Sequence, residues 1–136
     1  MMLEKVKIFT DGGARGNPGP SGIGVVVYDT NDNILKQKSE FIGKATNNQA
    51  EYRAVIAAFE LLDPKTTREI DFYLDSELVV KQLKGEYRVK NADLAPLFVK
   101  VHNQIILYKK VTFRHIRREM NKEADRLANI AMDAGK

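Results

Sequence analysis

The chain has 136 residues, of which 43% are hydrophobic and 29% are charged, and this length and composition suit a single soluble globular domain over residues 1–136. The 22 lysines and arginines exceed the 18 aspartates and glutamates, and this formal net charge of +4 allows a polyanionic partner without requiring one. The sequence has no cysteine, which excludes disulfides and thiolate metal sites, and no apolar run of the ~20 residues that cross a bilayer, so we expect no membrane partner.

Three strands are expected in the first third of the chain. Apolar and polar residues alternate over 5–10, which predicts a short strand that ends at Asp11, because the glycine- and proline-rich stretch 12–22 should not continue it. The apolar run 22–28 is typical of a strand buried on both faces, and the lysine-rich stretch 34–42 is typical of a strand at a sheet edge. Their short connections predict an antiparallel meander.

A helix is expected over residues 46–62. Thr46 and Gln49 have the spacing of a capping box, in which each side chain bonds the other residue's backbone amide. Pro64 should end the helix. Glu51 falls on the apolar stripe, so the pattern predicts an acid on the inner face.

The second half of the chain predicts two further strands and three helices. Alternation over 70–75 indicates a strand that ends at Asp75, and Ser76 can cap a short helix after it. Asp93 can cap a longer helix that reaches Tyr108. The remaining elements are a strand over 111–116, a basic loop over 114–120 and a helix over 121–132. This order predicts a mixed sheet with helices packed on its faces.

Four acids stand at positions that simple surface placement does not explain. Asp11 and Asp75 end strands, Glu51 is on an inner helical stripe, and Asp125 is beside the apolar face of the last helix. Carboxylates gathered in one semi-buried place repel one another and lose hydration, so such a cluster persists mainly where cations neutralise it. Hard divalent ions with oxygen ligands suit this set, and two such ions suit phosphodiester cleavage. Sequence spacing alone does not show that the four acids meet.

Four motifs carry a resemblance to a known family. They are Thr10-Asp11-Gly12-Gly13 with Gly16-Asn17-Pro18-Gly19, Thr46-Asn47-Asn48-Gln49-Ala50-Glu51, Asp75-Ser76, and Asn121-Lys122-Glu123-Ala124-Asp125-Arg126-Leu127-Ala128. In this order and spacing, from about Lys5 to Met132, the chain resembles type I ribonuclease H. The resemblance implies the α/β ribonuclease H-like fold, a five-stranded mixed sheet with helices on both faces. Its strands 1–3 form an antiparallel meander, and strands 4 and 5 run parallel to strand 1.

The resemblance also implies an activity. The chain is expected to be an endonuclease that hydrolyses the RNA strand of RNA/DNA hybrids, leaving 5′-phosphate and 3′-hydroxyl ends. Two Mg²⁺ ions, with Mn²⁺ as a substitute, would be held by Asp11, Glu51, Asp75 and Asp125. His115 matches the family's mobile-loop histidine, which would shuttle a proton or help release product. We expect a cytoplasmic monomer with no organic cofactor, and the N-terminus shows no export signal.

The resemblance assigns a second group of residues to the nucleic acid. It implies contacts to the hybrid for Asn17, Asn47, Asn48 and Ser76. At these contacts the sugar 2′-hydroxyls would distinguish the RNA strand from DNA. A phosphate of the DNA strand would sit against Thr46, Asn91 and Lys44. Lys44 replaces an arginine of many relatives, which exchanges a bidentate donor for a point charge. The small residues of the 12–22 turn would let the backbone approach the sugar-phosphate chain closely.

Two departures from the family pattern affect substrate binding. The stretch 84–90 replaces the longer basic protrusion of many bacterial relatives, as in the archaeal-like branch, and this should weaken electrostatic affinity. Glu77 stands where some relatives have a glutamine that touches nucleic acid, so that contact is not expected here.

Other interpretations remain open at the level of sequence. Taken singly, Asp11 is also a turn former, and Asp75 or Asp125 is also favoured near a helix start. A binding module for hybrids or double-stranded RNA with vestigial acids is one alternative, although the complete tetrad argues against it. A nuclease of the same fold that acts on double-stranded RNA or on DNA junctions is another.

Overall fold

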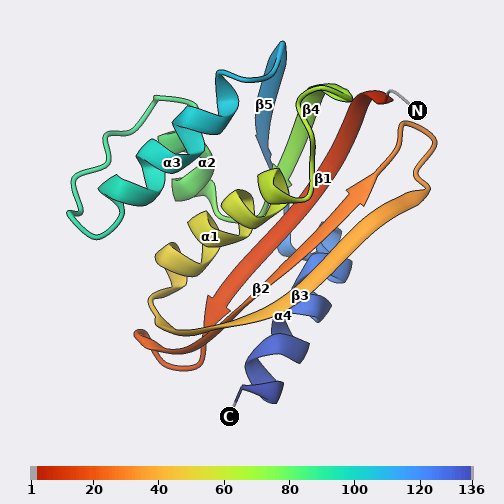
Figure 1. Ribbon diagram of the computed structural model, residues 1–136. Coiled ribbons are helices and arrows are strands. Elements are labelled where there is room, and N and C mark those ends of the chain that lie inside the picture. Colours follow the sequence, from red (N-terminus) through yellow and green to blue (C-terminus); the bar gives the residue numbers. More distant parts are fainter. Residues whose placement is uncertain (1–2, 136) are drawn as a thin grey trace.

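Five strands form one mixed sheet in the computed structural model, which describes residues 3–135 (Figure 1). The strands are β1 (Leu3–Ala14), β2 (Gly19–Tyr28), β3 (Ile34–Ala45), β4 (Thr67–Leu74) and β5 (Lys110–His115). Their order in the sheet is β3-β2-β1-β4-β5. The first three form an antiparallel meander, and β4 pairs in parallel with both β1 and β5. The predicted fold class is confirmed.

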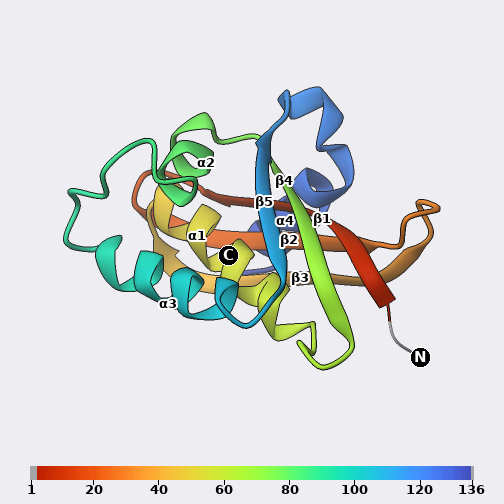
Figure 2. The ribbon, with the colours of Figure 1, turned by 90° about the horizontal axis from the view of Figure 1, so that it is seen from above.

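Helices cover both faces of this sheet. They are α1 (Asn47–Glu60), α2 (Glu77–Leu83), α3 (Ala95–Ile105) and α4 (Lys122–Ala134), with a short 3₁₀ turn, η1 (Arg118–Met120), before α4. α1 packs on β1 and β2 with α3 outside it, and α4 packs on the opposite face against β1, β2 and β3 (Figures 1 and 2). No helix within residues 3–135 is long and apolar enough to cross a membrane.

The main core lies between α1 and the sheet. Tyr52 and Phe59 of α1 are almost fully buried, and Phe59 contacts Phe72 of β4 at a ring-centroid distance of 5.1 Å. The alternation seen in the sequence places Val6 and Ile8 of β1 on this face, with no exposed surface. The apolar side chains therefore fix which face of β1 meets α1.

β1 is longer than the sequence predicts. It does not end at Asp11, because Gly12 and Gly13 continue the antiparallel ladder opposite Ile23 and Gly22 of β2. Glycine ends a strand only where the backbone turns away, and here β2 supplies hydrogen-bonding partners for the extended chain. Asp11 therefore lies within a paired strand and is held more rigidly than a residue at a strand end.

The glycines of β1 and β2 let helices approach the sheet closely. A Cβ at Gly12 would lie 2.3 Å from the carbonyl oxygen of Ala50 in α1. A Cβ at Gly24 would lie 2.1 Å from the carbonyl oxygen of Ala124 in α4. Atoms cannot approach to these distances, so both positions require glycine. The glycine-rich stretch thus serves helix packing as well as the turn.

The helix ends confirm some predictions and correct others. The capping box is present, since the Thr46 hydroxyl accepts from the Gln49 amide at 3.1 Å and the Gln49 side chain accepts from the Thr46 amide at 2.9 Å. Ser76 caps α2, accepting from the Val79 amide at 3.3 Å. α1 ends at Glu60 rather than at about residue 62, because Leu61 already forms its C-cap.

The prediction that Asp93 caps the third helix is wrong. α3 begins at Ala95, its N-cap is Leu94, and no side chain caps it. The Asn91 side chain instead accepts from the Asp93 amide at 2.7 Å, so the residues before α3 form a local turn. The helix ends at Ile105 rather than at Tyr108. Its apolar face packs mainly against α1, and most of its residues are exposed or half-buried.

Candidate active site

Three carboxylates meet beyond the end of β4. Asp11 in β1 is 8% exposed, Glu51 in α1 is 6% exposed, and Asp75, directly after β4, is half-buried. One oxygen from each carboxylate lies within 4.8 Å of the others. Phe9 of β1 is paired in parallel with Tyr73 of β4. Asp11 is two residues after Phe9 and Asp75 is two residues after Tyr73, so both acids lie at the same end of the sheet.

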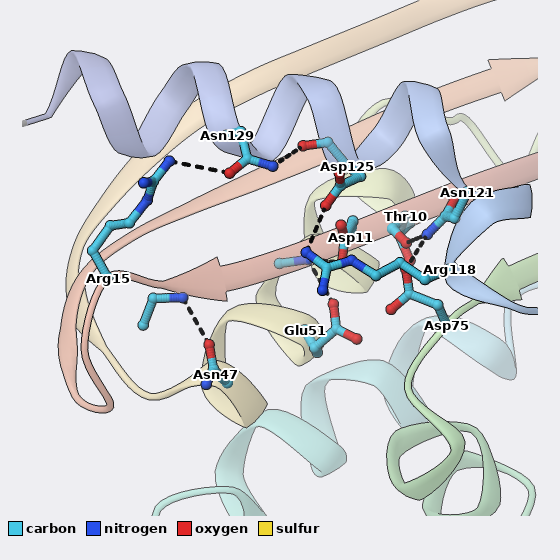
Figure 3. Close-up of polar contacts among 12 residues, drawn as sticks. Thr10, Asp11, Arg15, Asn47, Glu51, Asp75, Arg118, Asn121, Asp125 and Asn129 are labelled. Carbon is cyan, nitrogen blue, oxygen red and sulfur yellow. Dashed lines mark hydrogen bonds and ion pairs between the residues drawn. The ribbon is translucent and has the colours of Figure 1, made fainter.

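Asp125 approaches the same cluster from the opposite face of the sheet. It lies in the first turn of α4 and is half-buried, and its carboxylate adds to the negative charge around Asp11. Arg118 of η1 donates from Nη2 to Asp125 Oδ1 at 3.5 Å, with its guanidinium over the acids (Figure 3). The structure therefore brings together all four acids that the sequence singled out.

The backbone amide of Gly12 holds two of these acids. It donates to Glu51 Oε1 at 2.6 Å and to Asp11 Oδ1 at 3.0 Å. The close approach of α1 to β1 makes the first of these bonds possible, because a side chain at residue 12 would push the helix away. The glycine that permits this packing also orients the carboxylates.

Asn121 is a site residue that the sequence reasoning missed. It is 1% exposed, and its Nδ2 donates to the Thr10 carbonyl at 2.8 Å and to Asp75 Oδ2 at 3.0 Å (Figure 3). It thus links the start of α4 to β1 and to the residue after β4. Its place at the head of the Asn121–Ala128 motif was a signal, but an asparagine before a helix normally suggests only an N-cap. Its side chain forms no capping bond to α4.

Burial and mutual repulsion change the acidity of the two most enclosed carboxyls. Burial, followed by the nearby charge of Asp75, raises the pKa of Asp11 to about 7. Burial and the charge of Asp11 raise the pKa of Glu51 well above its usual value. Without a counter-charge, Asp11 and Glu51 therefore hold their protons to a higher pH than free carboxyl groups do.

The acids line an open cleft of about 580 Å³. The cleft extends from the carboxylates between the end of β1, the start of α1 and the side of α4 that carries Asp125, Asn129 and Met132. Besides the four acids, its lining includes the polar residues Arg15, Asn47, Asn48, Ser76, Arg118 and Asn129. Its open shape and polar lining leave room for an extended polar strand to lie across the acids.

His115 lies at the side of this cleft. It ends β5, its side chain is 41% exposed, and its Nδ1 is 4.0 Å from Glu77 Oε2 at the start of α2. Among the described residues, those that line the cleft do not include His115. The structure thus places the histidine near the acids' end of the sheet without bringing it into the cluster.

Most of the residues assigned to nucleic acid lie together. Thr46, Asn47, Asn48, Asn17 and Asn91 line a second cavity of about 400 Å³ next to the main cleft. The Asn17 side chain accepts from the Asn47 amide at 3.0 Å, which ties the turn after β1 to the start of α1. Ser76 lines the main cleft. Lys44 is exposed near the end of β3 and lines neither cavity.

The donor set fits a hard divalent cation. Three carboxylates offer oxygens within one small volume, and Asp125 adds a fourth acid at its edge. Oxygen ligands of this kind are those that Mg²⁺ and Mn²⁺ prefer. A bound cation would also neutralise the repulsion that raises the pKa of Asp11 and of Glu51.

Comparisons with known proteins agree with this geometry. Residues 9–131 match a family model described as "Reverse transcriptase-like". The chain is 42% identical over 131 residues to the bifunctional protein Rv2228c of Mycobacterium tuberculosis, covering 96% of this chain and 36% of that protein. It is 38% identical over 129 residues to ribonuclease HI of Halobacterium salinarum, covering 95% and 65%. The chain thus spans less than two thirds of these curated relatives.

Solved structures show the same similarity. The N-terminal RNase H domain of Rv2228c superposes with a TM-score of 0.93 at 41% identity, covering 97% of this chain and 96% of that one. LC11-RNase H1, solved in complex with an RNA/DNA hybrid, superposes with a TM-score of 0.87 at 43% identity, covering 95% and 97%. Sequence, fold and the gathered carboxylates agree, and the chain belongs to the ribonuclease H family.

Proposed function

We propose that this chain is an endonuclease that hydrolyses the RNA strand of RNA/DNA hybrids, with 5′-phosphate and 3′-hydroxyl products. The observation that carries the proposal is the carboxylate cluster of Asp11, Glu51 and Asp75, whose oxygens converge in an open cleft. The hybrid bound to the similar LC11-RNase H1 supports the substrate class. Gathered carboxylates are costly unless cations neutralise them, which favours metal-dependent phosphodiester chemistry over a purely structural role.

Asp11, Glu51, Asp75 and Asp125 would hold two Mg²⁺ ions, for which Mn²⁺ can substitute. When bound, these ions lower the pKa of the attacking water and offset the charge that develops on the leaving 3′ oxygen. The protein fixes the ligands beforehand: the Gly12 amide orients Asp11 and Glu51, and Asn121 orients Asp75. Preset ligands reduce the reorganisation needed during the reaction.

Two cationic or titratable side chains flank the carboxylates. The Arg118 guanidinium lies at Asp125 and can donate to an oxygen of the scissile phosphate. His115, at the side of the cleft, would accept or return a proton at its imidazole and help product to leave. Because His115 stands outside the cluster, its role is to assist turnover rather than to hold metal.

The cavity beside the cleft would select the hybrid. Asn17, Asn47, Asn48 and Ser76 offer short polar side chains for sugar 2′-hydroxyls of the RNA strand. Thr46 and Asn91 would hold a phosphate of the DNA strand with Lys44 nearby. We expect the protein to act in the cytoplasm as a monomer, without an organic cofactor or a membrane partner.

The test is to incubate purified protein with end-labelled RNA/DNA hybrid, double-stranded RNA and double-stranded DNA, with Mg²⁺, with Mn²⁺ and with chelator. We expect internal cuts in the RNA of the hybrid, only when metal is present, and 5′-phosphate ends on the products. Binding without cleavage under either metal would instead indicate a hybrid-binding module. Cleavage of double-stranded RNA or of DNA in preference to the hybrid would indicate a nuclease with another substrate.

A further inference from the structure

Arg15 reaches across the cleft from the end of β1 to α4. Its Nη2 donates to Asp133 Oδ1 at 2.8 Å and to Asn129 Oδ1 at 3.1 Å (Figure 3 draws the contact with Asn129). Arg15 and Asn129 both line the same cleft as the four acids. The guanidinium is therefore held at a fixed place in the wall of the cleft.

The helix that holds Arg15 is also the one that carries Asp125. Asn129 donates from Nδ2 to the Asp125 carbonyl at 2.9 Å, so its amide is itself fixed. With a rise of about 1.5 Å per residue, Asn129 and Asp133 lie roughly 6 and 12 Å along the helix axis from Asp125. Arg15 thus stands one to two helical turns beyond the metal-binding carboxylates.

Arg15 is one of few positive charges in a cleft that is mainly acidic. Of the described residues that line it, four are acids and only Arg15 and Arg118 carry a positive charge. Arg118 lies over the acids, and Arg15 lies further along α4 (Figure 3). A polyanionic strand that crosses the acids would therefore next meet Arg15.

The guanidinium has donors available for such a strand. Only Nη2 is used in the two contacts with α4, and the Arg15 side chain is 48% exposed. Within residues 3–135, Nε and Nη1 of Arg15 make no hydrogen bond to another side chain or to the backbone. A planar guanidinium with free, fixed donors matches phosphate oxygens well.

We propose that Arg15 binds a non-bridging oxygen of an RNA-strand phosphate close to the scissile one, with its guanidinium held by Asn129 and Asp133. This inference rests on the proposed function. Arg15 acts on substrate position and affinity rather than on the chemical step. The competing explanation is that Arg15 and Asp133 form an ordinary surface ion pair with no role in substrate binding. Such exposed pairs are common and contribute little to stability.

Arg15→Ala tests the inference, with Arg126→Ala as the matched control. Arg126 is also an arginine paired with an acid, donating from Nε to Glu123 Oε1 at 2.7 Å, but it does not line the cleft. We expect Arg15→Ala to raise KM for the hybrid about tenfold with kcat within about twofold. The slope of log affinity against log salt should fall by about 1, as for one lost phosphate contact. Arg126→Ala should change neither.

A scan of neutral linkages locates the contact. Single methylphosphonates are placed at successive positions of the RNA strand, each after a 2′-O-methyl nucleotide that keeps the linkage intact. The reference hybrid carries the same 2′-O-methyl nucleotide with an ordinary phosphate. At one position near the cut, the methylphosphonate should raise KM about tenfold for the wild type, relative to the reference hybrid. The same methylphosphonate should leave KM unchanged for Arg15→Ala, as in a double-mutant cycle.

The outcomes separate this inference from the proposed function. An active wild type with Arg15→Ala equal to Arg126→Ala refutes the role of Arg15 alone. The role is also refuted if each methylphosphonate raises KM by the same factor for Arg15→Ala and for the wild type. A wild type that cleaves no hybrid refutes the proposed function and this inference with it.

Discussion

Asp11 stands at the most crowded point of the carboxylate cluster. It lies within a paired strand, its oxygen accepts from the Gly12 amide at 3.0 Å, and acids from three other segments of the chain surround it. Its pKa of about 7 means that a folded protein without metal carries an unfavourable charge there at alkaline pH. Asp11, which we propose as a metal ligand, is thus a residue whose negative charge is disfavoured by folding alone.

Asp11→Asn should separate these two effects. The change keeps size and shape but removes the charge, so metal-dependent cleavage of hybrid should fall by at least about 10³-fold. The metal-free protein should become more stable at pH 8, by about 1–3 kcal/mol, because the buried repulsion is relieved. Hybrid cleavage assays and urea unfolding in chelator measure the two effects. Asp32→Asn, at an exposed acid outside the cleft, is the control. Near-normal activity of Asp11→Asn would refute its role as a metal ligand.

Asn121→Ala tests whether the orientation of Asp75 matters. The alanine leaves Asp75 Oδ2 and the Thr10 carbonyl without their buried donor. Loss of a partner that orients a metal ligand typically costs 10- to 100-fold in metal affinity or activity, and we expect a loss of about that size. Calorimetric titration with Mn²⁺ measures the affinity. An unchanged affinity in a folded variant would show that Asn121 has only a structural role.

His115→Ala should slow turnover without abolishing it. The side chain stands beside Glu77 and outside the carboxylate cluster, so metal and hybrid binding should persist. We expect a fall of about 100-fold in the cleavage rate, at the low end of what a lost proton-transfer group costs. Single-turnover and steady-state rates would distinguish chemistry from product release. A loss as complete as that of Asp11→Asn would mean that the histidine is essential to the chemistry.

At the scale of elements, the site depends on how closely two helices approach the sheet. α1 brings Glu51 over Gly12. α4, which carries Asp125, crosses the sheet with Ala124 and Ala128 over Gly24, and Gly24 pairs with Asp11 across the β1–β2 ladder. A methyl group at either glycine would force the helix outward. The distance between acids on different elements is therefore set by backbone packing.

Gly24→Ala should reveal this dependence. Its Cβ would meet the Ala124 carbonyl at 2.1 Å and the Ala128 amide nitrogen at 2.8 Å, and backbone atoms of a helix cannot give way singly. We expect a loss of about 3 kcal/mol or more in the free energy of unfolding, measured with urea. Gly43→Ala is the control: it has a φ of +79° and nothing within 4 Å, so only about 1 kcal/mol of backbone strain is expected. Equal losses would contradict the packing argument.

At the scale of the whole molecule, the acid cluster sets a pH dependence of stability. The folded pKa of Asp11 and of Glu51 exceeds the unfolded value, so between those values the folded state binds more protons. Stability contributed by these groups is present below about pH 4 and is lost as the pH rises toward and through about 7. Acids with lowered pKa values, such as Asp29 and Asp71, act at lower pH and do not oppose this trend above pH 5.

The metal-free protein should therefore melt at a lower temperature at pH 8 than at pH 5.5. Saturating Mg²⁺ should raise the melting temperature at pH 8 and have little effect at pH 5.5, because protonated carboxylates do not bind metal. Calorimetry in chelator and in Mg²⁺ measures both effects. Asp11→Asn is the reference, because its melting temperature should depend less on pH. A wild-type melting temperature that rises with pH in chelator would contradict the electrostatic argument.

Local sequence pattern predicted most of the elements. Alternation over 5–10 and 70–75 located two strands, and the Thr46 to Gln49 spacing located the start of α1, because these signals depend on neighbouring residues only. The same reasoning failed at the 12–22 stretch and at Asp93. There the outcome depends on a partner strand and on a local turn, which near neighbours do not reveal.

The sequence by itself determined the order of the elements, the family and the four acids, since motif spacing and periodicity are written in the chain. Only the tertiary structure decided that Asp11, Glu51 and Asp75 meet within 4.8 Å, that Asn121 holds Asp75 and that Arg15 reaches α4. These contacts join residues that are dozens of positions apart. Their geometry follows from the parallel pairing of β1 with β4 and from the glycines that let α1 and α4 come close.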